Sequence, residues 1–336
     1  LKLWINPGGS YTIDNAFTLD GGRVYSQDGQ YNLTGAMTLN AGGGTLGGTW
    51  QNKYLQVSGV ISGTGGLTVE DSDNSSQVAD VILSGVNTYT GNTVIGNNVV
   101  LQITGAGKLG SGSYAGTISN TGTLEYNSSA NQTMSGVISG AGALVKDNTG
   151  TLTLTGANTY TGATTVSGGI LRLQGSVGFD AGLIPGTSMI TVENGAELNV
   201  ASVWNTTMDN QVVLNGGTLN FTAGSATDAQ NFLNTITLNN GAQMIGNAVR
   251  MGYLSDASIT VGGSSASTIS SGVMLVNEAN GTPQRTVTFD VADVTSNAST
   301  DLLVSGVIGD HPDPFGAATL SKTGAGTMEL TGTNTY

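Results

Sequence analysis

An internal repeat limits what this chain can fold into more than any other feature of its sequence. Residues 134–173 begin with Met-Ser-Gly-Val-Ile and later contain Asn-Thr-Tyr-Thr-Gly followed by a short apolar run. The same two elements return at about 57–101 and 303–336, so we define three repeat modules. Apolar and polar residues alternate between glycines in runs typical of strands and too short for helices. The predicted strands include residues 10–13, 143–146, 151–155, 164–166 and 170–173. Repeated short strands predict a stacked, solenoid-type fold.

A simpler unit in the second half gives the period of this fold. Three turns containing Asn-Gly place glycines at Gly195, Gly216 and Gly241, which gives spacings of 21 and 25 residues (216 − 195 and 241 − 216). Glycine supplies the positive φ that tight turns need. A period of about 20 to 25 residues is the length of one coil of a parallel solenoid. A meander of hairpins would also give short strands, but it does not predict this longer period.

We therefore predict an all-β fold, a single-stranded right-handed parallel β-helix (β-solenoid), as one continuous domain over residues 1–336. No segment shows convincing helical spacing; the nearest candidate, residues 226–233, would form at most a turn or two in a loop. Residues 72–80 and 309–317 interrupt the modules between their two elements and are predicted to bulge from a coil as loops.

Composition excludes some partners and leaves the compartment open. The net charge is −13, with 9 Lys and Arg against 22 Asp and Glu, and the cations do not cluster. Nucleic acid and anionic membrane surfaces are therefore not expected as partners. No apolar run reaches the roughly 18 to 20 residues of a membrane span, so we expect no membrane insertion by this segment. The absence of Cys fits either a reducing compartment or an exported chain.

The repeat module resembles the autotransporter-associated β-strand repeat, found in passenger domains of type V secreted bacterial surface proteins. In module 134–173 the matching positions are Leu144, Lys146, Gly150, Leu152, Leu154, Gly156, Asn158, Thr159, Tyr160, Gly162, Thr164 or Thr165, Val166, Gly169 and Leu171. In module 303–336 they include Leu320, Lys322, Gly324, Gly326, Leu330, Gly332, Asn334, Thr335 and Tyr336. Module 57–101 keeps Asn87, Thr88, Tyr89 and Gly91 but has Val69 and Glu70 in the lysine region and an acidic insertion. The specific motif covers about a third of the chain.

We interpret the Asn-Thr-Tyr positions as structural. Tyr89, Tyr160 and Tyr336 are expected to cover coil corners, with each ring on apolar neighbours and each hydroxyl in water. The matching asparagines are expected either to satisfy backbone groups at the turn or to stack as a ladder. Because the chain starts at Leu1 without Met and stops inside a module, we also expect it to be a piece of a longer passenger.

Candidate sites for chemistry are sparse. His311, the single histidine, could combine with Asp310 and Asp313 around a metal. One such triplet without a second histidine, stiffened by Pro312 and Pro314, favours a plain exposed loop. No Gly-x-Ser-x-Gly element accompanies His311, so no catalytic triad is indicated.

The run 70–74 begins like a calcium loop but lacks its sixth-position Gly and closing Glu, so a solvated acidic loop is favoured. Gly-rich runs 42–44 and 262–263 lack the Lys of a phosphate loop and are predicted turns. We predict no catalytic residues, no cofactor and no metal.

The resemblance implies a secreted, non-enzymatic stalk or adhesin segment at the bacterial cell surface or outside the cell. Its role would be adhesion or self-association, with stacking into fibres as a variant. Its partners would be copies of itself, or glycans or proteins of host or bacterial surfaces. The alternative is a β-helical polysaccharide lyase or hydrolase, which requires clustered Asp or Glu with Arg or Lys. The acidic residues here are scattered singly and show no such cluster in the sequence. Ice binding would need threonine rows in register, for which only residues 151–155 are suitable.

Overall fold

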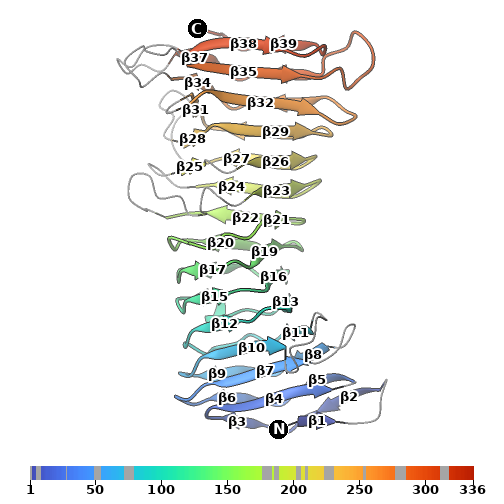
Figure 1. The fold of residues 1–336 in the computed structure, drawn as a ribbon, viewed down its shortest axis with the longest axis vertical. Coiled ribbons are helices and arrows are strands. Elements are labelled where there is room, and N and C mark those ends of the chain that lie inside the picture. The colour runs from blue at the N-terminus through green and yellow to red at the C-terminus, as the bar shows by residue number, and fades with distance from the viewer. Residues whose placement is uncertain are drawn as a thin grey trace. The chain divides into compact units, whose positions relative to one another are not determined.

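The computed structural model describes residues 2–4, 9–27, 29–48, 54–71, 79–175, 184, 189–201, 206–208, 211–222, 231–252, 255–276, 285–310 and 318–336. Within these ranges, every element is a strand except one 3-10 turn, η1 (Gly110–Gly112). The chain forms two compact units, Leu1–Thr164 and Thr165–Tyr336. In each unit, parallel strands stack one coil after another (Figure 1). This confirms the predicted all-β parallel solenoid for each unit, while the hand of the winding stays a prediction.

Unit Leu1–Thr164 contains three columns of parallel strands. The first consists of β1 (Lys2–Trp4), β4 (Gly22–Gln27), β7 (Gly44–Gly48), β10 (Leu67–Asp71), β12 (Thr93–Ile95), β15 (Ile118–Asn120) and β18 (Ile138–Ser139). The second consists of β2 (Ser10–Ile13), β5 (Gln30–Leu33), β8 (Tyr54–Val57), β11 (Ala79–Leu83), β13 (Val99–Gly105), β16 (Thr123–Ser128) and β19 (Ala143–Lys146). The third is made by two sets, β3 (Phe17–Leu19), β6 (Met37–Leu39) and β9 (Ile61–Gly63), then β14 (Ser113–Tyr114), β17 (Gln132–Met134) and β20 (Thr151–Leu154).

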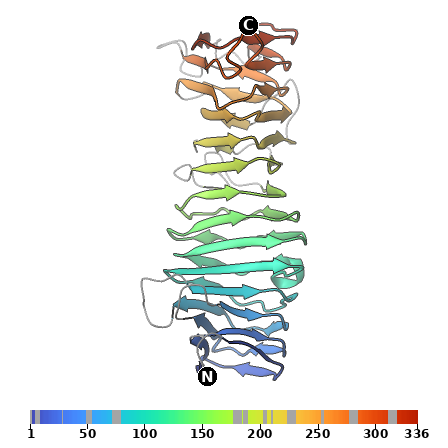
Figure 2. The same ribbon diagram turned by 90° about the vertical axis from the view of Figure 1, so that its right-hand side faces the viewer.

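Unit Thr165–Tyr336 repeats this arrangement, and β21 (Thr164–Val166) lies at the unit boundary. One column consists of β23 (Ile190–Glu193), β26 (Val212–Asn215), β29 (Thr235–Asn239), β32 (Ala257–Gly262), β35 (Thr286–Val291) and β38 (Thr319–Thr323). A second consists of β22 (Ile170–Leu173), β24 (Glu197–Val200), β27 (Thr218–Phe221), β30 (Gln243–Gly246), β33 (Ser267–Ile269), β36 (Leu302–Val304) and β39 (Met328–Leu330). The third consists of β25 (Thr206–Met208), β28 (Asn231–Leu233), β31 (Val249–Met251), β34 (Val273–Leu275) and β37 (Ile308–Asp310). Figure 2 shows the strands of each unit in successive layers.

Strand alternation decides which side chains enter the core. Leu33, Val57 and Leu83 lie opposite one another on β5, β8 and β11 and are fully buried. Their strand neighbours Asn32 and Gln56 face outward and keep part of their surface in solvent. Burying an aliphatic side chain of this size contributes about 1.5–3 kcal/mol, so each coil is stabilised mainly through such columns.

Several predicted strands have the bounds found in the structure. Residues 10–13, 143–146, 164–166 and 170–173 form β2, β19, β21 and β22. The three Asn-Gly turns also behave as expected, with φ of 79°, 76° and 76° at Gly195, Gly216 and Gly241. Alternation and turn glycines act locally, which is why the sequence located these elements well.

Three predictions about irregular segments were wrong within the described residues. Asn231–Leu233, the end of the helix candidate 226–233, is strand β28, because it pairs in register with β25. Residues 79–80 begin strand β11 and are not part of a loop, since they pair with the start of β13. Residues 309–310 end strand β37. In each case pairing with an adjacent coil fixes the backbone. The rest of these three segments lies outside the described residues.

Candidate functional site

The asparagine of each Asn-Thr-Tyr element joins its coil to the preceding Ser-Gly-Val-Ile element. Asn87 accepts a hydrogen bond from the backbone N–H of Ile61 at 2.9 Å. Asn158 and Asn334 accept the corresponding bonds from Ile138 and Ile308, both at 2.8 Å. The residue after each asparagine donates its own N–H to the carbonyl of the same isoleucine, at 2.7 to 2.9 Å. The two elements therefore recur together because they are hydrogen-bonding partners on successive coils. Backbone satisfaction, rather than an asparagine ladder, is what these distances show.

Tyr89 and Tyr160 do not place their hydroxyls in water, so the prediction was wrong for these two module tyrosines. Both side chains are fully buried. The Tyr89 hydroxyl lies 2.8 Å from the hydroxyl of Thr93, and the Tyr160 hydroxyl lies 2.7 Å from that of Thr164. A threonine four residues later thus supplies the partner that water would have supplied. Burial raises the pKa of both phenols well above the ordinary value, so both hydroxyls stay protonated.

The lysine of module 134–173 is a core residue whose ammonium group reaches a turn. Lys146 lies in the same column as Tyr126 and is fully buried. Its Nζ donates to the carbonyls of Asp147 and Asn148 at 2.7 and 2.8 Å. Lys322 Nζ makes the equivalent bonds to the next two residues, at 3.1 and 2.9 Å. Burial lowers the pKa of Lys146 to about 8, against the opposing charge of Asp147.

Glycines at two module positions allow coils to approach closely. A Cβ on Gly136, in the Ser-Gly-Val-Ile element, would lie 2.1 Å from the carbonyl oxygen of Gly116 on the preceding coil. A Cβ on Gly162, after Asn-Thr-Tyr-Thr, would lie 2.2 Å from the carbonyl oxygen of Gly142. Neither distance is sterically possible, so these glycines are required by contact between backbones. The repeat positions therefore serve coil stacking, and the only strongly exposed side chains among them are the threonines and those of the last coil.

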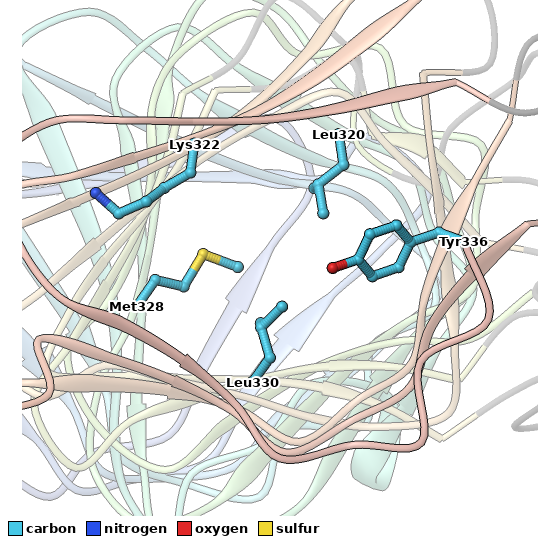
Figure 3. Close-up of a pocket in the computed structure, with 5 residues that line it drawn as sticks. All are labelled: Leu320, Lys322, Met328, Leu330 and Tyr336. Atoms are coloured by element: carbon cyan, nitrogen blue, oxygen red, sulfur yellow. The ribbon is translucent and has the colours of Figure 1, made fainter.

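A pocket of about 430 Å³ opens at the last coil and corresponds to core positions elsewhere (Figure 3). It is lined by Leu320, Lys322, Met328, Leu330 and Tyr336. The equivalent residues of module 134–173 are all buried: Leu144, Lys146, Leu152, Leu154 and Tyr160. Figure 3 shows the five side chains directed into the interior of the coil. We therefore assign this pocket to the solenoid interior and not to a ligand site.

A group of charged and aromatic side chains occurs on the outward face of β4 and β10. Arg23 Nη1 donates to the hydroxyl of Tyr25 at 2.9 Å and to Oε1 of Glu70 at 3.0 Å. The Tyr25 hydroxyl in turn donates to Glu70 Oε1 at 2.5 Å. Acidic residues were expected to lie apart from cations, and this expectation was wrong for Glu70. The two charges are 47 residues apart, so only the stacking of coils brings them together.

Asp301 is a further buried polar residue that the sequence analysis did not single out. Its Oδ1 accepts from the N–H groups of Val294 and Thr295 and from the Thr295 hydroxyl, at 2.8 to 2.9 Å. Its Oδ2 accepts from the N–H of Thr327 at 2.7 Å. These bonds, led by that of Thr327, lower the pKa of Asp301 despite opposing burial. Asp301 thereby fastens the loop before β36 to the next coil.

The remaining candidates give no assembled centre within the described residues. His311 and Asp313 lie outside them, and Asp310 is the last residue of β37. Of the acidic run 70–74, Glu70 and Asp71 end strand β10 instead of forming a loop, and the other three residues lie outside the described ranges.

In the ranges that the structure describes, no three His, Cys, Asp or Glu residues gather to hold a metal. No helix in those ranges is long and apolar enough to span a membrane. In run 42–44, Gly43 has φ of 71° and Gly44 begins β7; in run 262–263, Gly262 ends β32 and Gly263 has φ of 86°.

Fold and repeat geometry together define a solenoid repeat protein whose repeated polar residues join one coil to the next. The model of the passenger-associated-transport-repeat family matches residues 80–103, 144–173 and 320–336. The chain is also 34% identical, over 196 residues, to the adhesin BmaC autotransporter of Brucella suis biovar 1 (strain 1330). That match covers 52% of this chain and 5% of the relative's length. No solved structure matches the chain. The chain therefore contains the repeats of autotransporter passenger domains, and its sequence is of the autotransporter passenger type.

Proposed function

We propose that this chain is a segment of an adhesin-like autotransporter passenger, secreted to the bacterial surface and acting without catalysis. The observation that carries the proposal is the set of passenger repeats in a chain similar to an autotransporter adhesin. The geometry supports the same role, because the repeated polar groups of each module bond to backbone or to one another. Such a module builds a scaffold, and its outward faces make the contacts with other molecules.

Adhesion by this scaffold would rest on many weak contacts repeated from coil to coil. Parallel stacking places equivalent outward residues in register, as for Thr237 and Thr260 on β29 and β32. Repeated weak contacts give an avidity that exceeds the affinity of any one of them. Partners of this kind are surface glycans, surface proteins or further copies of the chain. Self-association and stacking into fibres are the finer variant of the same proposal.

The test is display of the full-length protein on a non-adherent Gram-negative host. Adherence to epithelial cells and to abiotic surfaces, and settling of the culture by aggregation, are compared with an empty-vector strain. We expect a gain in at least one of the three. A protein shown at the surface by antibody labelling but causing no gain in any of them would contradict the adhesive role. Release of reducing ends from a polysaccharide panel by the purified chain would favour the enzyme alternative instead.

Sedimentation velocity separates adhesion from self-association. The purified chain is measured over a hundredfold range of concentration, with the net charge screened by salt. A sedimentation coefficient that rises with concentration supports self-association. If the sedimentation coefficient stays constant and displayed protein still promotes adherence, the chain adheres to other surfaces and does not self-associate.

A further inference from the structure

We infer that the outward face of β4, β7 and β10 is a binding site for one neutral sugar unit of a glycan. This inference rests on the proposed adhesive function and specifies its ligand class and its location. The site consists of Arg23, Tyr25 and Glu70 together with an adjoining glycine-lined groove, and it lies wholly within unit Leu1–Thr164.

The groove is a shallow hollow of about 220 Å³ beside these side chains. Its lining includes the corner glycines Gly42, Gly43 and Gly66, and the outward threonines Thr45 and Thr68. Glycines leave backbone groups accessible where other residues would cover them. The hollow is smaller than the roughly 300–1,000 Å³ of pockets that enclose a drug-sized ligand, which limits its occupant to a small unit such as one sugar ring.

Strand register places the charged and aromatic residues directly next to the groove. Arg23 pairs with Thr45, and Thr45 pairs with Thr68, so these three form one outward column. Tyr25 and Glu70 belong to the next outward column, separated by Gly47. Both columns lie on paired strands, which fixes the mutual positions of the polar groups before a ligand arrives.

Gly47 permits the arrangement by leaving room for the tyrosine ring. A Cβ at Gly47 would lie 2.8 Å from Tyr25 Cδ1 and 2.9 Å from Cε1. The ring therefore crosses above Gly47, and its hydroxyl reaches Glu70 on the following coil. Tyr25 is half-buried, so part of the ring remains in contact with solvent. A ring held over Gly47 in this way offers an apolar surface to the C–H face of a sugar.

The polar groups favour hydroxyls over ions as ligands. The Arg23 side chain is 61% exposed and carries N–H donors, while Glu70, at 31% exposed, carries acceptor oxygens. Donor and acceptor side by side match the paired hydroxyls of a sugar. Their charges cancel each other, and the carboxylate of Asp20, bonded to the N–H of Gly42 in the groove lining, adds a negative charge. A neutral ligand is therefore favoured over an anionic one.

The test is binding of the full chain to an array of neutral oligosaccharides, with sialylated and sulfated glycans as the second arm. Hits are measured by titration with the corresponding free neutral sugar. A site for one sugar unit predicts a dissociation constant of about 1 mM. Tyr25→Ala and Arg23→Ala are each expected to weaken binding about tenfold or more. Tyr25→Phe keeps the ring and is expected to have a smaller effect.

Tyr54→Ala is the matched control, because Tyr54 is a half-buried tyrosine on the outward face of β8 in the same unit. It should leave binding unchanged, and far-UV circular dichroism should show that all variants are folded. Unchanged binding in Tyr25→Ala would overturn the inference, as would an array in which no neutral glycan binds or only anionic glycans do. If displayed protein with Tyr25→Ala still adheres, this site does not carry the adhesion, and the proposed function is unaffected. If even the wild type does not adhere, the proposed function itself is wrong.

Discussion

Removing the Asn87 side chain tests whether the module asparagine holds two coils together. In Asn87→Ala, the buried N–H of Ile61 loses the acceptor that lies 2.9 Å away. The carbonyl of Gly85 loses the bond from Asn87 Nδ2 but keeps the one from the N–H of Lys108. Only one of the two backbone groups is therefore left without a partner.

The expected magnitude follows from these contacts. An unsatisfied buried N–H costs about 1–3 kcal/mol, and the lost bond to Gly85 adds about 1 kcal/mol. We therefore expect Asn87→Ala to lower the free energy of unfolding by about 2–4 kcal/mol. Coils of a solenoid are stabilised largely by their nearest neighbours, so the loss should be concentrated around residues 61 and 87.

Urea unfolding gives the total change, and amide hydrogen exchange gives its location. Protection of the Ile61 amide should fall by at least tenfold, since 1.4 kcal/mol corresponds to a factor of ten. Thr88→Ala is the matched control, because this neighbouring side chain is exposed and should change stability by less than about 0.5 kcal/mol. Asn334→Ala removes the same bond at a half-buried position, where water can replace it, and should cost about 1 kcal/mol. An Asn87→Ala variant as stable as Thr88→Ala would refute the reasoning.

Three further predictions concern close packing and charge. Gly136→Ala should lower the free energy of unfolding by about 1–3 kcal/mol, because its Cβ would meet a backbone oxygen at 2.1 Å. Gly96→Ala is the control: its nearest contact would be 3.3 Å, so its loss in the same urea melts should be clearly smaller. The pKa of Lys146 is lowered from 10.5 to about 8, so its charged form is disfavoured in the fold. The stability of the wild type relative to Lys146→Met should therefore rise between pH 8 and 10.5, by about 2 kcal/mol after allowance for screening; a pH-independent difference would contradict this. Asp301→Asn should destabilise at neutral pH, since an amide N–H would face the N–H of Thr327. Because the pKa of Asp301 is lowered, the wild type's advantage should shrink as pH falls below about 4, and an advantage that persists at lower pH would count against the assigned bonds.

The repeat explains why so much of the local structure followed from sequence. Alternating residues such as 143–146 and 170–173 specify strands by themselves, since alternation sets which side chains face the core. Asn-Gly turns likewise need no tertiary information, because positive φ is a property of the residue. Where pairing with an adjacent coil decided the backbone, as at Asn231–Leu233, the sequence pattern pointed the wrong way.

The sequence by itself determined the coil length, the strands and the identity of the repeat, because all three are recorded in local spacing. Only the tertiary structure decided what the polar side chains do. Stacking buries the hydroxyl of Tyr160 against Thr164 and draws Lys146 into a column of core residues. The same stacking joins Arg23 to Glu70 across 47 residues. Such contacts depend on which coils become neighbours, and no local pattern of residues contains that information.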